Sequence, residues 1–243
     1  MLCASAYTAS DYASVGMYKG RTFKWGYFPE VKKYNIDHLL SQKRKNTLRW
    51  CGRFIDWKHP DDAIQVARKL KESGYDFCLN MIGAGVMEEQ LKQLVKDYNL
   101  EEDVHFLGSM SPEQVRSYME QAGIYLFTSD RQEGWGAVLN ESMNSGCAVV
   151  ASREIGSVPF LVRDGENGCV YEAENVSMMY EKVKFLLDHP GKREELGKNA
   201  YETIICEWNA ETAAKRFLQL AECCLNGEKI SSGFDIGPGT NAK

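Results

Sequence analysis

The feature that most constrains the fold is a regular alternation, from about Asn46 to Ser152, of short apolar runs and longer segments with helical periodicity. The apolar runs lie at 47–53, 75–83, 104–108, 124–129 and 147–152, and the helical patterns lie at 60–74, 86–98, 111–123 and 135–145. Strands that alternate with helices are joined by crossover connections, which make the strands parallel and place helices on both faces of the sheet. The sequence therefore predicts a doubly wound α/β domain.

The two ends of the chain do not follow this alternation. Residues 1–45 contain one plausible strand, 22–28, and are too few for a complete domain of their own. Residues 175–226 show two or three helical patterns, whereas residues 227–243 are rich in Gly, Ser and Lys, a composition typical of disordered tails. We therefore expect a short N-terminal segment, a sheet domain followed by helices, and a disordered C-terminal tail.

Charge and cysteine usage narrow the classes of function. The net charge is −5 and no long basic run occurs, which argues against a nucleic-acid partner. The eight cysteines form no C-x-x-C pair, and several lie within apolar runs, so a reducing, cytoplasmic location is expected. The first residues lack the pattern of a signal peptide, and no apolar stretch is long enough to cross a bilayer. Peripheral association with a membrane remains compatible with the sequence.

The loop after the first strand of the sheet domain carries Gly52, Arg53 and Lys58. Ligands of open parallel sheets bind at the carboxyl ends of the strands, so the loops that follow strands are the expected positions for chemistry. A Gly-Arg turn followed by a lysine can bring two fixed cations to one phosphate group, with the guanidinium binding in a bidentate manner. The alternative is two ordinary exposed cations at the end of a strand.

Two further loops carry weaker signals. The sequence "IGAGVMEEQL" after the second strand resembles a truncated Gly-x-Gly fingerprint, with Glu88 where a third glycine would stand. On its own this pattern is equally well explained as a tight turn into a helix. Phe106, Leu107 and Gly108 after the third strand could simply end a buried strand.

The segment "RQEGWGAVLNESMNSGCAVVAS" places Glu133 in a glycine-rich loop and Glu141 inside the following helix. The positions with inward helical spacing are Trp135, Val138, Leu139, Ser142, Met143 and Gly146. Glu141 lies beside this stripe, so core packing does not explain it. Gly134 and Gly136 allow a ligand to approach the backbone closely, and the start of the helix offers free N–H groups to an anion. Two carboxylates here suit sugar hydroxyls on either side of a diphosphate, and the alternative is two solvated glutamates.

Taken together in their order, these segments resemble the family-4 retaining glycosyltransferases with the GT-B fold, the glycosyl transferases of group 1. The two glutamates are separated by seven residues, as in the E-x7-E signature of that family. The other matching segments are "GRFIDWK", "IGAG", "VHFLG", "FTS", "SGCAVVAS" and "GSVPFLVRDGENG", and they run from about Leu48 to Gly168. The segment "CEWNAETAAKRF" resembles the later crossover helix. The resemblance implies a Rossmann-like sheet that forms the C-terminal half of a GT-B fold.

The resemblance also implies roles for individual residues. Arg53 and Lys58 would hold the diphosphate of a nucleoside diphosphate sugar, expected to be UDP-linked, and Glu133 would contact the transferred sugar. The ribose hydroxyls would bind Glu141. Gly52 would also contact the nucleotide sugar. The residues near the base would be Gly83, Gly85, Val86, Phe106 and Leu107. The residues near the sugar and the distal phosphate would be Gly134, Trp135, Gly136, Ala137 and Val138. Members of this family usually need no metal or other cofactor.

Two departures from the family pattern limit what can be carried over. Where many members have Gly-Gly-(Ile/Val)-Pro-Glu, this chain has Gly-Ser-Val-Pro-Phe, ending at Phe160, so the usual sugar preference is in doubt. The resemblance also leads us to expect that the N-terminal acceptor domain of a GT-B enzyme is missing. We therefore expect residues 1–45 to be a remnant of that domain and its linker, residues 46–226 the donor-binding domain with its C-terminal helices, and 227–243 a disordered tail.

The leading hypothesis is the donor domain of a hexosyltransferase involved in polysaccharide biosynthesis, inactive as an isolated fragment. A glycan or lipid-linked acceptor would reach it through the missing domain. One alternative is a nucleotide-sugar binding module without activity of its own. A Rossmann oxidoreductase is another, but the glycine fingerprint is incomplete and follows the second strand. A UDP-sugar epimerase of related fold is the weakest alternative.

Overall fold

A six-stranded parallel sheet forms the centre of the molecule in the computed structural model, which describes residues 1–226 and 236–242. Its strands are β3 (Arg44–Cys51), β4 (Cys78–Ile82), β5 (Val104–Phe106), β6 (Ala122–Phe127), β7 (Ala148–Ser152) and β8 (Cys169–Tyr171). They lie in the order β5-β4-β3-β6-β7-β8, and every neighbouring pair is parallel. The prediction of a doubly wound, Rossmann-like α/β sheet is confirmed.

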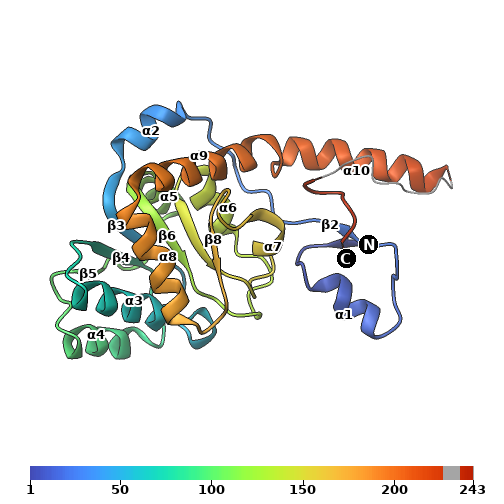
Figure 1. Cartoon of the computed structure of the whole chain (residues 1–243). Helices are drawn as coiled ribbons and strands as arrows, with labels where there is room; N and C mark the ends of the chain where they lie inside the picture. The colour runs from blue at the N-terminus through green and yellow to red at the C-terminus, as the bar shows by residue number, and fades with distance from the viewer. Residues whose placement is uncertain (227–235, 243) are drawn as a thin grey trace.

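Helices cover both faces of this sheet (Figure 1). They are α3 (Pro60–Glu72), α4 (Glu88–Asp97), α5 (Pro112–Gln121), α6 (Ala137–Asn144), α7 (Val158–Leu161), α8 (Val176–Asp188) and α9 (Pro190–Cys206). The last helix, α10 (Ala210–Leu225), extends away from the sheet (Figure 1). Side chains alternate along each strand, so Leu48 and Trp50 of β3 join one apolar core with α3, α4 and α8. The opposite core contains residues of α5, α6 and α9, among them Met119, Met143 and Ile204.

The strand order reverses at β3, which has β4 on one side and β6 on the other. A crevice forms at the carboxyl ends of strands where the order reverses, because the connections leave to opposite sides. The loops that follow β3, β4 and β6 therefore converge at one place. These are the loops in which the sequence predicts the functional residues.

The N-terminal segment forms a small unit beside the sheet domain. It contains β1 (Leu2–Cys3), α1 (Thr8–Ser14) and β2 (Phe23–Lys24), and α2 (Ile36–Gln42) follows in the linker. β1 and β2 pair in parallel. The strand expected over 22–28 is thus reduced to two residues, since its ladder with β1 covers only Phe23 and Lys24.

Residues 236–242, within the segment 227–243 where the sequence predicts disorder, lie beside the N-terminal unit. Residues 239–242 pair with the segment around β2: Lys24 N–H donates to the carbonyl of Thr240 at 2.7 Å, and Ala242 N–H donates to the carbonyl of Thr22 at 2.9 Å. Arg216 of α10 donates to the carbonyls of Ile236 and Pro238. These bonds place the two chain ends side by side (Figure 1). Residues 227–235 and 243 lie outside the described part.

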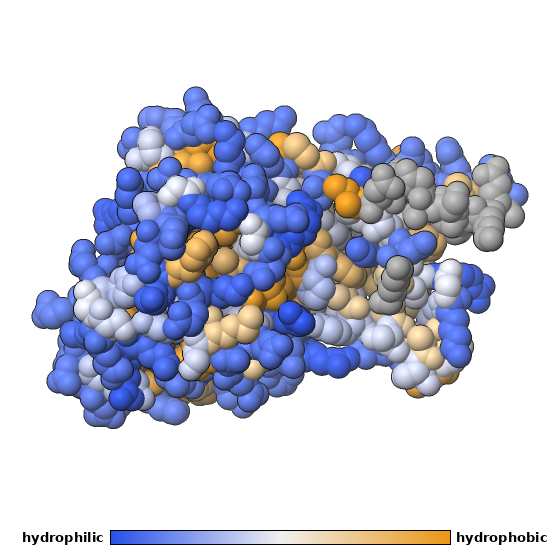
Figure 2. All heavy atoms as spheres, viewed as in Figure 1, coloured by the Kyte–Doolittle hydropathy of each residue, from blue (hydrophilic) through white to orange (hydrophobic). Residues whose placement is uncertain are grey.

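The surface in Figure 2 is mostly hydrophilic, with apolar side chains near the middle of the view. Among residues 1–226 and 236–242, no helix is both long enough and apolar enough to span a membrane.

Candidate functional site

Backbone hydrogen bonds join the loops that follow β3, β4 and β6. Gly52 N–H donates to the carbonyl of Ile82 and Phe54 N–H to that of Ala84, both at 3.0 Å. On the other side, Asp130 N–H donates to the carbonyl of Trp57, also at 3.0 Å. The loop after β3 is thus the central one of the three, and its residues face both neighbouring loops.

Lys58 and Glu133 lie in contact across the reversal point of the sheet. The Lys58 Nζ donates to Glu133 Oε2 and forms an ion pair with it, although the residues are 75 positions apart in the chain. Their side chains are only 14% and 13% exposed. Ser129 Oγ lies 3.5 Å from the same carboxylate oxygen. The structure therefore brings together two of the three residues, Arg53, Lys58 and Glu133, that the resemblance assigns to the diphosphate and the transferred sugar as the catalytic groups.

A buried chain of hydrogen bonds fixes the backbone of Lys58. The indole N–H of Trp50 donates to Thr128 Oγ1 at 2.8 Å, and the Thr128 hydroxyl donates to the carbonyl of Lys58 at 2.6 Å. Lys58 ends a short 3-10 turn, Asp56–Lys58, and His59 follows with a φ of 45°. Because Trp50 and Thr128 come from the ends of β3 and β6, the two central strands of the sheet together position this lysine.

Trp57 lies close to both of the cations that are predicted to bind phosphate, Arg53 and Lys58. Its ring lies 4.7 Å from Lys58 Nζ and 5.9 Å from the guanidinium carbon of Arg53, within the range of cation–π attraction. Arg53 itself is exposed. The sequence analysis did not single out Trp57, and the signal that could have found it is its position between the two cations in "GRFIDWK".

The predicted base-binding residues differ in how accessible they are. Gly83 has a φ of 136°, and a Cβ there would lie 1.9 Å from the carbonyl oxygen of Gly52, whereas a Cβ on Gly85 would lie 2.3 Å from that of Phe54. Both glycines therefore allow the loops after β3 and β4 to pack backbone against backbone. Val86 is 90% exposed beside them. Phe106 and Leu107 are half-buried, and the Phe106 ring packs edge-on against Phe54 at 5.8 Å.

Glu141 has a carboxylate that makes no hydrogen bond or ion pair with any residue in 1–226 or 236–242. The residue is half-buried in α6, and burial raises the pKa of its carboxyl, an effect that the charge of Arg116 partly offsets. Burial, with a smaller contribution from the charge of Glu141, raises the pKa of the Cys51 thiol to about 11. The charge of the Glu141 carboxylate is thus felt at Cys51, the last residue of β3.

The helix α6 begins at Ala137, two residues later than the sequence predicts, because Gly136 has a left-handed conformation. Gly136 precedes the helix with a φ of 74°, and Gly134 is exposed, with open space where a side chain would begin. Trp135 is buried, its indole N–H donates to Asn140 Oδ1 at 2.9 Å, and its carbonyl accepts from Ser157 Oγ. The buried ring of Trp135 therefore holds this loop against the apolar core. Ala137 and Val138 are half-buried in the first turn, and Leu139, Ser142 and Met143 of the predicted inward stripe are fully buried.

Phe160 belongs to the same aromatic core. Its ring stacks on Trp208 at 6.0 Å and lies 6.4 Å from that of Trp135. An aromatic side chain at this position therefore packs under the loop that carries Glu133. A glutamate here would place a charge within an aromatic cluster, which is costly without a partner.

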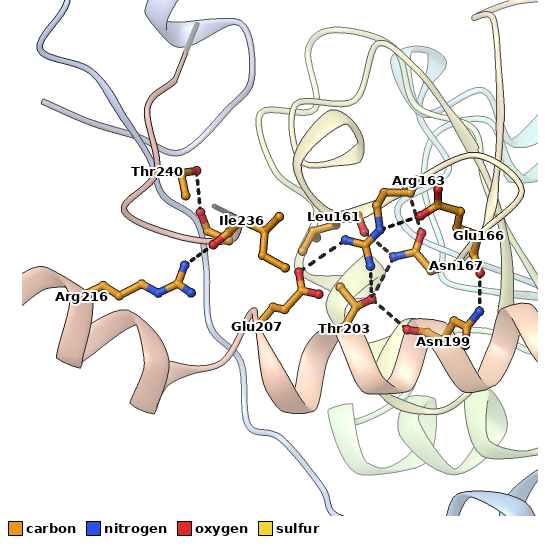
Figure 3. A network of polar contacts seen from close by, with 11 residues as sticks. Leu161, Arg163, Glu166, Asn167, Asn199, Thr203, Glu207, Arg216, Ile236 and Thr240 are labelled. Atoms are coloured by element: carbon orange, nitrogen blue, oxygen red, sulfur yellow. Dashed lines mark hydrogen bonds and ion pairs between the residues drawn. The ribbon is translucent and has the colours of Figure 1, made fainter. Parts of the chain in front are cut away.

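The segment "RDGENG" forms a polar network away from the crevice (Figure 3). Asn167 is fully buried, accepts from Arg163 N–H at 2.6 Å and donates to Leu161 O and to Thr203 Oγ1, both at 2.9 Å. The Arg163 side chain reaches Glu207 at 3.4 Å and Thr203 Oγ1 at 3.3 Å. These contacts fasten the turn before β8 to α9, so this segment supports the sheet.

The fold is that of a Rossmann-like α/β domain, and comparison with known proteins identifies its family. Residues 31–203 match the model of the glycosyl transferases group 1, and the chain belongs to that family. This membership sets aside the oxidoreductase and epimerase hypotheses.

Individual relatives agree with this family. The chain is 26% identical over 204 residues to the trehalose synthase of Pyrococcus horikoshii, covering 79% of this chain and 48% of the relative. It resembles a structure of TarM from S. aureus with a TM-score of 0.77 at 22% identity, covering 90% of this chain and 43% of the other. It also resembles HepE from Anabaena, with a TM-score of 0.73 at 18% identity, covering 91% and 62%. Its sheet domain matches the C-terminal Rossmann-like domains of GT-B glycosyltransferases.

The chain spans about half the length of the curated relatives it matches.

Proposed function

We propose that this chain is the donor-binding half of a retaining, family-4-like hexosyltransferase that uses a UDP-linked sugar. The observation that carries the proposal is the convergence, at the reversal point of the sheet, of two cations and two carboxylates: Arg53, Lys58, Glu133 and Glu141. Two cations suit a diphosphate, and carboxylates on either side of it suit the hydroxyls of a ribose and of a hexose.

Arg53 and Lys58 would bind the diphosphate and neutralise the charge that develops on it as the sugar leaves. Both cations contact the ring of Trp57, which keeps them within reach of one ligand. Arg53 is exposed and can turn its guanidinium towards a phosphate, whereas Lys58 is held by its backbone carbonyl and by Glu133. Cations placed beside the diphosphate would stabilise the negative charge that develops on this leaving group.

The two carboxylates would bind hydroxyl groups. Glu133 is already oriented by Lys58 and would accept from the transferred hexose, with the backbone of residues 134–136 beside it. Glu141 is half-buried without a protein donor, and an unpaired carboxylate in such a place is costly unless a ligand supplies hydrogen bonds. The ribose hydroxyls would supply them, and the exposed Val86 would lie beside the base.

Structures of similar proteins support the proposal that the nucleotide is UDP and that the sugar is a hexose. The HepE structure was obtained with UDP and glucose, and the TarM structure contains UDP. We propose the same nucleotide for this chain, with no metal or other cofactor. A glycan or lipid-linked acceptor would bind through an N-terminal domain of the whole enzyme, so the 243 residues alone should transfer sugar negligibly. A cytoplasmic location and peripheral membrane association remain predictions.

Thermal denaturation with added ligand tests the proposal. UDP at about a hundred times its dissociation constant should stabilise the protein by about 2.7 kcal/mol, whereas NAD at the same concentration should not stabilise it. This stabilisation needs no other domain, because the four residues proposed to contact the nucleotide sugar all lie within this chain. Stabilisation by NAD equal to that by UDP would contradict the proposed function.

A further inference from the structure

A short segment of the N-terminal unit, residues 5–11, contacts the loop that carries Glu133. Asp11 Oδ1 forms an ion pair with Arg131 Nη2 at 2.6 Å, across 120 positions of the chain. The guanidinium of Arg131 also lies 4.8 Å from the centre of the Tyr7 ring. Arg131 is two residues before Glu133, so this segment contacts the loop close to the carboxylate that pairs with Lys58.

The same segment contacts the loop after β7. The Tyr7 hydroxyl donates to the carbonyl of Arg153 at 2.7 Å, and Ala6 N–H donates to the carbonyl of Gly156 at 2.8 Å. The fit is close, because a Cβ on Gly156 would lie 2.3 Å from Ser5 Oγ. Burial raises the pKa of the Tyr7 hydroxyl, so it stays protonated and keeps donating this bond.

Both contacted loops fix the backbone of Glu133. Gly156 N–H donates to the Glu133 carbonyl at 2.9 Å, and Glu133 N–H donates to the carbonyl of Asp130 at 3.1 Å. A Cβ on Gly156 would also lie 2.1 Å from the carbonyl oxygen of Gly134, so the two loops pack backbone against backbone. Displacing residues 5–11 would therefore loosen both supports of Glu133.

We propose that Tyr7 and Asp11 are positioning residues that set the Glu133 carboxylate for the transferred sugar by holding Arg131. We call Tyr7, Asp11 and Arg131 the sugar clasp. It rests on the proposed function, since it assumes that Glu133 contacts the sugar. Residues 5–11 lie outside the region 31–203 that matches the family model, so this support is built by a different part of the chain. The position of the N-terminal unit would thereby affect how Glu133 contacts the sugar without affecting how Arg53 and Lys58 contact the diphosphate.

Three variants test the clasp: Asp11→Asn, Arg131→Gln and the double variant. The control is Glu211→Gln, which removes an exposed ion pair to Lys215 of the same 2.6 Å length on α10. Calorimetry gives the dissociation constants of UDP and of the hexose conjugate that the wild type binds best among UDP-glucose, UDP-galactose and UDP-N-acetylglucosamine. The preference for the conjugate over UDP should fall about three- to tenfold in each clasp variant, with UDP affinity unchanged or slightly higher.

The double variant should lose no more preference than Arg131→Gln, because that substitution already removes both the ion pair with Asp11 and the contact with the Tyr7 ring. Equal losses of affinity for UDP and for its hexose conjugate, or no loss of either, would overturn the proposal. Hydrogen exchange of residues 129–136 in the ligand-free protein is the second readout. It should be faster in Asp11→Asn than in the wild type and the control, and unchanged exchange would also overturn the clasp. If the wild type binds no UDP compound, the proposed function fails, and the exchange result still decides whether residues 5–11 hold this loop.

Discussion

Replacing Glu133 with glutamine should strengthen the binding of UDP while weakening the recognition of its sugar. In the ligand-free protein the ammonium of Lys58 is occupied by the Glu133 carboxylate, and both side chains are largely buried. A diphosphate that binds Lys58 would lie on the order of 6 Å from that carboxylate. At an effective dielectric constant of about 20, a pair of like charges at this distance repels by about 3 kcal/mol before Lys58 screens it.

The neutral amide removes this repulsion and frees Lys58 for the phosphate. We expect UDP affinity to rise by about 1–2 kcal/mol, or roughly 5- to 30-fold. The hexose conjugate gains the same amount but loses a charge-assisted acceptor for its hydroxyls, which costs about 1.5–3 kcal/mol. Its affinity should therefore stay nearly constant or fall, and the ratio between the two dissociation constants should change by about 10- to 100-fold.

Isothermal titration calorimetry of the wild type and of Glu133→Gln measures the affinity of each protein for UDP and for the hexose conjugate. The ligand-free variant should also be less stable by about 1–3 kcal/mol, because Lys58 remains largely buried without its partner. Bound UDP should restore part of that loss. Unchanged or lower UDP affinity in the variant would refute the reasoning, since it would mean that Lys58 does not serve the diphosphate.

Three further substitutions give distinct expected results. Arg53→Ala should weaken UDP binding by about 1.5–3 kcal/mol and leave uridine binding unchanged in a titration, and equal losses would place Arg53 away from the phosphates. Burial raises the pKa of Asp62 to about 6, so its ionisation costs folding free energy as the pH rises through the interval from 4 to 6. Urea denaturation should therefore show Asp62→Asn gaining about 2–3 kcal/mol over the wild type between pH 4 and pH 7, and a constant difference would contradict this. Gly83→Ala should lower the free energy of unfolding by about 2–3 kcal/mol, because its φ is 136° and its Cβ would meet the Gly52 carbonyl; a loss below about 0.5 kcal/mol would contradict the packing.

Five of the six strands of the sheet could be predicted from the sequence because each is a local signal, whereas β8 has only three residues and is not predicted. The runs around Trp50, Met81 and Val150 are apolar over the length of a buried parallel strand, and helical patterns separate them. The loops that carry Arg53 and Glu133 could be predicted for the same reason, since ligands bind where such strands end. These inferences use neighbours within about ten residues.

Contacts between distant segments could not be predicted in this way. The Lys58–Glu133 ion pair and the Asp11–Arg131 ion pair each depend on two loops meeting in space, and nothing in either loop indicates its partner. The placement of Trp57 against Lys58 depends on the turn that ends at His59 with a positive φ, a conformation that is uncommon for a non-glycine residue. The order of residues 236–242 likewise depends on their pairing with β2 and on Arg216, and composition alone favours disorder.

A structure of the protein with UDP bound tests the central claim most directly. The account predicts the diphosphate between the guanidinium of Arg53 and the ammonium of Lys58, with the ribose hydroxyls donating to the Glu141 carboxylate. Lys58 should then share its hydrogen bonds between Glu133 and a phosphate oxygen. UDP bound with its phosphates at the glycine turn after β4, or with Glu141 still unpartnered, would contradict the account.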